Sequence, residues 1–153
     1  MLRQKIFQIN AFTSETFSGN PALVCPLRGW LDDRLMQRIA AESGLTCAFF
    51  VGGDGNYEVR WFTPTAEIGG ICGHGTLASG FVILTESDDR SDEITFRVQV
   101  GDLRVRRSHA GYVLDLPALH PTEQPKPDNI RAIFGPTPDA LVGALDLIGV
   151  SPR

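Results

Sequence analysis

The chain has 153 residues, of which 42% are hydrophobic and 21% are charged, as is usual for a soluble globular protein. Fourteen basic and eighteen acidic side chains give a net charge of −4 without a basic cluster, which argues against nucleic acid or an anionic membrane as a partner. No apolar run reaches the ~20 residues of a membrane span and no signal-peptide pattern is present, so we expect a cytoplasmic protein. The three cysteines lack metal-ligand spacing, and we expect neither a metal nor a disulfide framework.

Two strands and a helix are predicted in the first part of the chain. Residues 6–12 and the apolar run 22–25 have the pattern of strands, separated by a loop that ends in Gly19-Asn20-Pro21. A helix should begin at Asp32-Asp33, because carboxylates suit the positive end of the helix dipole, and should stop at Gly44. The apolar face of this helix is predicted from the positions of Leu31, Leu35, Met36 and Ile39.

A charge-free helix is predicted in the centre of the chain, between strands. Residues 47–51 and the alternating segment 57–61 are the strands that precede it. Residues 72–85 contain no charged side chain and are apolar on every side, which is typical of a buried helix. We therefore expect strands to surround this helix.

The remaining chain indicates a domain boundary. Residues 94–116 are predicted to form an antiparallel meander, and the proline-rich stretch 117–127 suits a linker. The first domain is therefore expected to span residues 1–117. Residues 118–153 would be the linker and the start of an incomplete second domain, with a helix beginning near residue 137 and continuing to Ile148.

The strongest local signal is the glycine-rich stretch 69–76, directly before the predicted buried helix. Unpaired N–H groups at a helix start form an anion site when glycines allow close approach. Gly73 and Gly75 would let a substrate carboxylate reach the backbone. The same glycines would also let the buried helix pack tightly, and the pattern alone leaves both explanations open.

Two side chains in this stretch have a functional and a structural interpretation. The unperturbed pKa of histidine is near neutrality, so His74 could bind substrate or move a proton, or it could be a structural histidine bonded to a carbonyl. Its place between two glycines favours function. The helix dipole would lower the pKa of the Cys72 thiol, which could then remove a proton next to a carboxylate. Most buried cysteines are unreactive core residues, and we favour that interpretation for Cys72.

Several motifs together resemble the PhzF-like (phenazine biosynthesis-like) isomerases. Residues 8–12 and 19–24 resemble the opening of that family, and Phe62-Thr63-Pro64, Glu67 and Cys72-Gly73-His74 follow in the family's order. The likeness extends from about residue 5 to about residue 117. The string Cys-Gly-His-Gly-Thr also resembles the active-site motif of proline racemases and epimerases of the same fold.

This resemblance implies an α+β domain of the diaminopimelate-epimerase-like fold, with a curved, mostly antiparallel sheet around a buried central helix. It implies isomerisation of a small carboxylate-bearing metabolite by proton transfer, without a cofactor, in a site between two similar domains. His74 would then be catalytic. The residues that the resemblance implies in substrate binding are Asn20, Thr46, Cys72, Gly73 and Gly75.

The sequence departs from the family's pattern in three respects. Cys47 stands where the family has the glutamate that moves the proton, and a thiol has a pKa of about 8.5 where a glutamate carboxyl has about 4.3. Asn10 replaces a family aspartate and cannot hold a charge. Members of the family are also roughly twice as long as this chain. If the chain is active, Cys47 occupies the proton-transfer position beside His74.

Three functions remain open at this point. The first is an isomerase whose site is completed by a second copy in a homodimer, or by a missing second domain. The second is a catalytically inactive module that binds small carboxylates or another protein. The third, a racemase that uses Cys47 or Cys72 as a base, ranks last because a one-base site needs a facing partner that this chain lacks.

Overall fold

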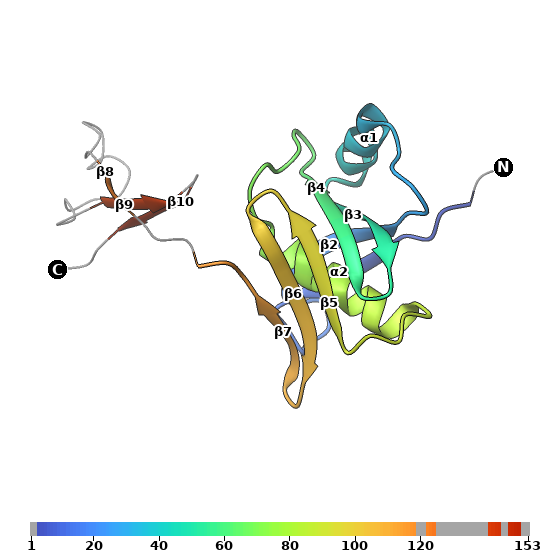
Figure 1. Ribbon diagram of the computed structural model, residues 1–153. Coiled ribbons are helices and arrows are strands. Elements are labelled where there is room, and N and C mark those ends of the chain that lie inside the picture. Colours follow the sequence, from blue (N-terminus) through green and yellow to red (C-terminus); the bar gives the residue numbers. More distant parts are fainter. Residues whose placement is uncertain (1–2, 119–121, 125–140, 145–146, 151–153) are drawn as a thin grey trace. The chain divides into compact units, whose positions relative to one another are not determined.

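The computed structural model describes residues 3–118, 122–124, 141–144 and 147–150. The chain divides into two compact units, with the boundary between Pro117 and Ala118. The described part of the first unit contains a seven-stranded sheet and two helices (Figure 1). The described part of the second unit contains a three-stranded sheet.

The strands of the larger sheet lie side by side in their chain order, β1 to β7. Neighbouring strands are antiparallel, except that β2 pairs with β3 and β4 pairs with β5 in parallel. The sheet is therefore mixed but mostly antiparallel, which confirms the predicted α+β class. The strands are β1 Phe7–Ala11, β2 Asn20–Pro26, β3 Thr46–Gly53, β4 Asn56–Phe62, β5 Glu93–Val98, β6 Gly101–Ser108 and β7 Gly111–Asp115.

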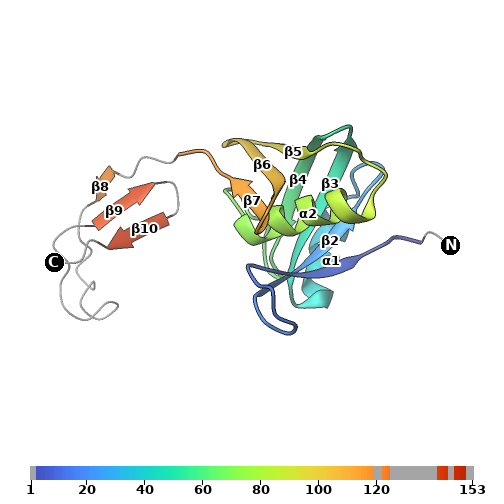
Figure 2. The same ribbon diagram turned by 90° about the horizontal axis from the view of Figure 1, so that it is seen from below.

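Helix α2, Gly73–Glu86, lies inside the curve of this sheet (Figure 2). It contacts both edge strands, β1 and β7, and also β2, β3, β5 and β6, so the sheet curls around it. Its apolar side chains share one core with residues of β3 and β5, among them Ala48, Phe50 and Phe96. The charge-free helix surrounded by strands is therefore confirmed. The wide apolar surface explains this arrangement, because each face of such a helix needs a partner.

Helix α1, Asp33–Ser43, covers the opposite face of the sheet over β3 and β4. The Asp32 side chain caps it by accepting a hydrogen bond from the Arg34 backbone N–H at 3.0 Å, and Gly44 ends it in the left-handed conformation at φ 68°. Both ends agree with the prediction. The buried face differs, because Met36 and Ala40 are buried while Leu35 is 44% exposed. Positions four apart share one stripe of a helix, and the small Ala40 lets this stripe sit close to the sheet.

The second unit contains strands where a linker and a helix were predicted. Its described strands, in the spatial order β10-β9-β8, are antiparallel. Strand β8 lies inside the predicted linker, where its position at a sheet edge is compatible with nearby prolines. The strands are β8 Thr122–Gln124, β9 Leu141–Ala144 and β10 Leu147–Val150.

The helix predicted from about residue 137 to Ile148 is wrong over β9 and β10, and residues 137–140 lie outside the described residues. Gly143 and Gly149 disfavour a helix, because glycine loses the most backbone freedom there. β-Branched side chains, including Val142 and Ile148, fit a pleated sheet better. The apolar stretch 141–150, interrupted only by Asp146, is apolar at too many positions for its period to separate these two alternatives.

Candidate functional site

The amino end of α2 has no side-chain cap. Cys72 is the N-cap residue, and its side chain does not form the hydrogen bond of a helix cap. The first intrahelical hydrogen bond runs from the Thr76 N–H to the Cys72 carbonyl at 3.0 Å, so the N–H groups of Gly73, His74 and Gly75 precede it. The first turn also contains no acidic residue. The positive end of the helix dipole is therefore not balanced by the helix's own side chains.

Gly73 lies between residues from the two edges of the sheet. A Cβ atom at this position would be 3.8 Å from Cδ2 of Leu114 in β7 and 3.9 Å from Cζ of Phe12, which follows β1. These are ordinary van der Waals distances, so packing does not require glycine here. Of the two explanations that the sequence left open, tight packing does not account for Gly73.

Gly75, by contrast, is required by packing. A Cβ atom here would lie 2.8 Å from Cδ1 of Trp61 and 3.0 Å from Sγ of Cys72. Trp61 is 2% exposed, and its Nε1 has no hydrogen-bond partner among the described residues. A buried indole N–H usually finds a partner. The first turn of α2 thus packs on an unpaired donor.

The side chains of Cys72 and His74 approach each other at this helix start, with Sγ 3.6 Å from Nδ1. Burial raises the pKa of the Cys72 thiol, and the backbone N–H of Gly75 acts more weakly in the opposite direction. Burial lowers the pKa of His74. Both groups are therefore neutral near pH 7, a thiol beside an imidazole. The lowered thiol pKa expected from the helix dipole is corrected, because burial outweighs it.

Asn20 and Thr46 lie on the α2 side of the sheet. In the parallel pair β2–β3, Ala22 is opposite Thr46. Ala22 and Ala48 pack in the α2 core, and because side chains alternate along a strand, Asn20 and Thr46 share that face. Ala48 is paired with Trp61, the residue on which the first turn of α2 packs. The structure therefore brings these two predicted binding residues to the same side of the sheet as the helix start.

Cys47 lies on the other face of the sheet. It is fully buried and packs with Met36 and Ala40 of α1 in a separate core. Its Sγ is 3.5 Å from Oγ of Ser43, and burial raises its pKa while the Ser43 hydroxyl acts in the opposite direction. The structure does not bring Cys47 and His74 together. A neutral thiol turned toward α1 does not face a ligand at the start of α2.

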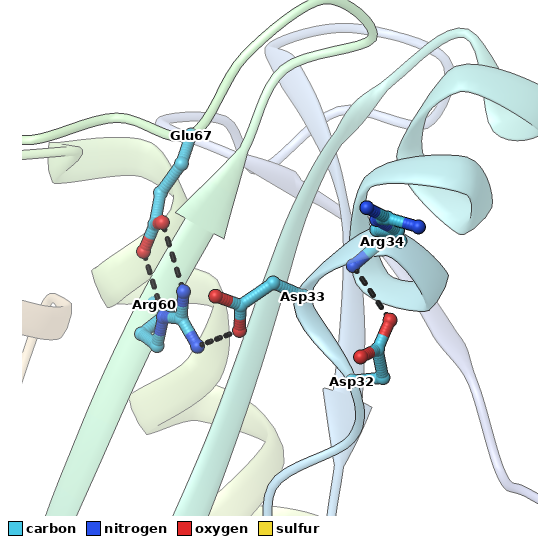
Figure 3. Close-up of polar contacts among 5 residues, drawn as sticks. All are labelled: Asp32, Asp33, Arg34, Arg60 and Glu67. Carbon is cyan, nitrogen blue, oxygen red and sulfur yellow. Dashed lines mark hydrogen bonds and ion pairs between the residues drawn. The ribbon is translucent and has the colours of Figure 1, made fainter.

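A cluster of ion pairs holds the loop that leads to α2 (Figure 3). Arg60 of β4 binds Glu67 through two hydrogen bonds, from Nε at 2.7 Å and from Nη2 at 2.8 Å. Its Nη1 donates to Asp33 in the first turn of α1 at 2.8 Å. The next loop residue, Ile68, donates its backbone N–H to the Trp61 carbonyl at 2.8 Å. Four residues before Cys72, the chain is thus tied to β4.

Within the described ranges, no group of three or more His, Cys, Asp or Glu side chains is placed to hold a metal ion. No described helix has both the length and the apolar character needed to cross a lipid bilayer. Cys25, Cys47 and Cys72 are all free and buried. The groups at the start of α2 that can act on a ligand are its backbone N–H groups, His74 and Cys72.

A family model described as phenazine biosynthesis-like protein (PhzC–PhzF) matches residues 9–131 of this chain, which is most of its length. The chain belongs to the PhzF-like family. The family and the fold predicted from the sequence motifs are confirmed by this match and by the solved structures below.

Known PhzF-like proteins are similar to the chain in sequence and in structure. An uncharacterized isomerase of Pseudomonas aeruginosa is 45% identical over 131 residues, which cover 85% of this chain and 50% of that protein. A crystal structure of a PhzC/PhzF protein from Clostridium difficile is 38% identical, with a TM-score of 0.74 over 93% of this chain and 55% of the other. A predicted epimerase from P. aeruginosa, 22% identical with a TM-score of 0.66 over 82% and 46% of the two chains, shows the fold alone. The chain thus spans about half the length of the PhzF-like relatives it matches.

Sequence reasoning missed three residues around the helix start of this PhzF-like chain. Phe12 and Leu114 flank Gly73, and Trp61 underlies Gly75. Their apolar character indicated core positions, but the sequence carried no signal that two edge strands and β4 meet at one end of α2. Only the curl of the sheet brings them there.

Proposed function

We propose that this chain forms one half of a cofactor-independent isomerase site, in which the start of α2 holds the carboxylate of a small metabolite. The observation that carries the proposal is the uncapped first turn, where the N–H groups of Gly73 and His74 precede the first intrahelical hydrogen bond. Such N–H groups and the helix dipole favour an anion. Relatives that are named isomerases support the class of reaction.

His74 is the group proposed to move the proton. Burial lowers its pKa, so the imidazole is neutral and can accept a proton from the carbon next to the substrate carboxylate. Negative charge then grows on the carboxylate oxygens, where the first-turn N–H groups would stabilise it. In a substrate with a C=C bond next to that carbon, return of the proton to the far carbon of the C=C bond moves the double bond and gives the isomer. The sequence of steps changes neither the charge nor the oxidation state of the substrate.

The other half of the site is proposed to come from a further domain or from a second copy of the chain in a homodimer. The chain covers about half of its relatives' length, and a two-fold axis would set a second helix start opposite the first. Asn20 and Thr46, on the α2 side of the sheet, would add neutral hydrogen bonds to the substrate. A reducing compartment such as the cytoplasm belongs to the proposal, because the three cysteines are free thiols.

A second candidate is carboxylate binding without catalysis. The observation that favours it is the place of Cys47, which the resemblance aligned with the family's catalytic glutamate. Its thiol is buried against α1 and faces away from α2. A chain that retained the helix start but lost the proton-transferring group would bind a carboxylate and leave it unchanged.

Carboxylate binding is tested by titrating the full chain with benzoate and with α-amino acids. Calorimetry and NMR measure the binding. We expect His74→Gln to weaken benzoate binding roughly tenfold, because a hydrogen bond to a charged group is lost. His109→Gln is the matched control, since His109 is an exposed histidine between β6 and β7. Failure of every carboxylate to bind, or equal affinity in both variants, would contradict the proposal. Exchange of solvent deuterium into the α-position of a bound amino acid then separates an isomerase from a binding module, because benzoate has no hydrogen on the carbon next to its carboxylate.

A further inference from the structure

The side chain of Arg60 joins the loop before α2 to the first turn of α1 (Figure 3). Two of its nitrogens bind the two carboxylate oxygens of Glu67, and the third binds Asp33. The guanidinium also lies over the rings of Trp30 and Phe62, with its Cζ atom 5.6 Å and 5.3 Å from the two ring centroids. These contacts together determine the position of the group. We call Arg60, Glu67 and Asp33 the Arg60 clamp.

The exposure of the Arg60 clamp indicates that it orients the chain more than it stabilises the fold. The side chains of Arg60, Glu67 and Asp33 are 27%, 41% and 72% exposed. Ion pairs as exposed as these contribute little to the free energy of unfolding, because water competes for both charges. The two parallel hydrogen bonds between a guanidinium and a carboxylate nevertheless favour one relative orientation. The clamp therefore mainly fixes the direction of the chain at Glu67.

The Arg60 clamp closes a short loop whose beginning is also held. The Thr63 carbonyl accepts a hydrogen bond from Nε2 of Gln37 in α1 at 2.8 Å. The Thr63 N–H donates to the Ala66 carbonyl at 2.8 Å, and the Thr63 hydroxyl accepts from the Ala66 N–H at 3.0 Å. Helix α1 thus holds the loop at one end, and the clamp holds it at the other.

Trp61 connects this loop to the start of α2. Phe62 packs in the α1 core and Trp61 in the α2 core, so Arg60 lies on the α1 side of β4, because side chains alternate along a strand. The Trp61 carbonyl accepts the N–H of Ile68 at 2.8 Å, at the end of the loop. The Trp61 ring underlies Gly75 in the first turn of α2. One residue of β4 therefore contacts both the end of the loop and the helix start.

Gly69 and Gly70 separate Ile68 from the helix start, and packing does not require glycine at either position. A Cβ atom at either residue would meet nothing within 4 Å. Two glycines allow many backbone conformations, so the direction in which the chain enters Cys72 depends on where Ile68 is held. The first-turn N–H groups of α2 follow directly. A shift at the end of the loop would therefore turn these donors.

We propose that Arg60 and Glu67 are positioning residues for the carboxylate site, because they hold the loop so that the first-turn N–H groups converge on the ligand. This inference rests on the proposed carboxylate site at the start of α2. Neither residue touches the ligand. A displacement of about 1 Å costs up to roughly a hundredfold in a site that depends on geometry. Loss of the clamp should therefore weaken binding although every ligand-binding group remains.

Glu67→Gln separates positioning from charge. Removal of a negative charge should strengthen the binding of an anion, whereas a loosened clamp should weaken it. We expect calorimetry to show benzoate bound roughly fivefold more weakly by Glu67→Gln than by the unmodified chain. Glu93→Gln is the matched control, because Glu93 of β5 is an exposed residue that pairs with Arg104 at 3.9 Å, and the variant loses the same charge. This control should bind benzoate with unchanged or slightly higher affinity.

Arg60→Lys keeps the charge and removes the two parallel hydrogen bonds. Benzoate should bind this variant roughly fivefold more weakly, while Arg104→Lys should bind it like the unmodified chain. NMR spectra without ligand give a second measurement. The N–H resonances of Gly73, His74 and Gly75 should shift in Arg60→Lys and stay in place in Arg104→Lys. Urea denaturation shows that each variant is folded at the temperature of the titration.

Three results would overturn the inference. The first is unchanged or tighter benzoate binding in Glu67→Gln, and the second is weakening of the same size in the two control variants. The third is a set of first-turn resonances that stays in place in Arg60→Lys, or in Glu67→Gln where Arg60→Lys does not fold. Failure of benzoate to bind the unmodified chain contradicts the carboxylate site itself, and the resonances still decide whether the clamp positions the helix start.

Discussion

The Sγ atom of Cys72 lies 3.6 Å from Nδ1 of His74. Burial raises the pKa of the thiol and lowers the pKa of the imidazole, so it favours the neutral form of each group. A Cys–His contact at a helix start would otherwise favour a thiolate beside an imidazolium. Here desolvation opposes both charges, so the free site contains a thiol and an imidazole. The helix dipole is thus left without a negative group of its own, which is the condition under which it attracts an anionic ligand.

This neutral pair predicts that Cys72 is slow to react with iodoacetamide at neutral pH. Burial raises its pKa above that of an ordinary thiol, so the alkylation rate of Cys72 in the native chain should rise only above about pH 9. Cys25, whose pKa burial raises to about 12, should react only after unfolding. Mass spectrometry of the alkylated peptides measures each site. A Cys72 rate that is already high and level near pH 6 would instead reveal an ion pair with His74.

Benzoate binding should strengthen as the pH falls from about 7 toward about 5. In the free chain, burial holds the pKa of His74 below its ordinary 6.5. A bound carboxylate stabilises the imidazolium, so the pKa of His74 rises in the complex and binding takes up a proton. A ligand whose binding takes up protons binds more tightly at lower pH. Calorimetry in two buffers of different ionisation enthalpy counts the protons, and the same pH dependence in His74→Gln would exclude His74 as their source.

The orientation of Cys47 shows what could not be predicted from the sequence. Strand β3 is buried on both faces, with Ala48 and Phe50 toward α2 and Cys47 and Phe49 toward α1. Alternation identifies the two faces only when one of them is polar. A strand between two helices has no polar face, so alternation does not show which helix each side chain contacts. Cys47 was therefore predicted in the right strand, but the sequence did not indicate whether its side chain points toward α1 or α2.

Elements with a strong local signal were predictable, and α2 is the clearest case. The apolar, uncharged segment 72–85 predicted a buried helix. The cap residues Asp32 and Gly44 predicted the two ends of α1. The neighbours of the helix start were not predictable, because Phe12 and Leu114 meet at Gly73 only when β1 and β7 close on α2. Such contacts depend on the curl of the whole sheet rather than on any local pattern.

Asp89 predicts an acid-sensitive contribution to stability. Its Oδ2 accepts hydrogen bonds from the Tyr57 hydroxyl at 2.7 Å and from the Gly55 N–H at 2.9 Å. Burial opposes its ionisation, but hydrogen bonds from Ser91, Tyr57 and Gly55 outweigh this and hold its pKa well below the ordinary 3.8. A lowered pKa in the folded state stabilises the fold above about pH 4, and this stabilisation is lost as the pH falls through the folded-state pKa.

Asp89→Asn should therefore lower the free energy of unfolding by ~1 kcal/mol at neutral pH, allowing for the solvent exposure of the carboxylate. Urea unfolding at several pH values measures this difference. The gap between variant and unmodified chain should narrow as the pH falls below about 4. Tyr57→Phe removes one hydrogen-bond donor to Asp89. Its loss of unfolding free energy relative to the unmodified chain should also narrow below about pH 4, but it should be smaller than that of Asp89→Asn. A gap that stays constant with pH would mean that the Asp89 charge does not contribute.

Gly80→Ala tests whether close packing or helix propensity governs the middle of α2. A Cβ atom at Gly80 would lie 2.5 Å from both Cβ and Cγ1 of Val105 in β6, too close for any real contact. We expect this variant to lose ~1–3 kcal/mol of unfolding free energy, although alanine gains ~1 kcal/mol over glycine in an exposed helix. Urea denaturation measures the sum of the steric cost and the gain in helix propensity.

The matched control is Gly29→Ala, because a Cβ atom there meets nothing within 4 Å and should change the stability by less than about 0.5 kcal/mol. A second substitution separates the steric cause from any other. Val105→Ala removes the two methyl groups that would clash but keeps the Val105 Cβ atom at 2.5 Å, so it relieves only part of the clash and should cost somewhat less in the Gly80→Ala background than alone. If the two substitutions are simply additive, or if Gly80→Ala stabilises the chain, then α2 does not lie as close to β6 as the glycine implies.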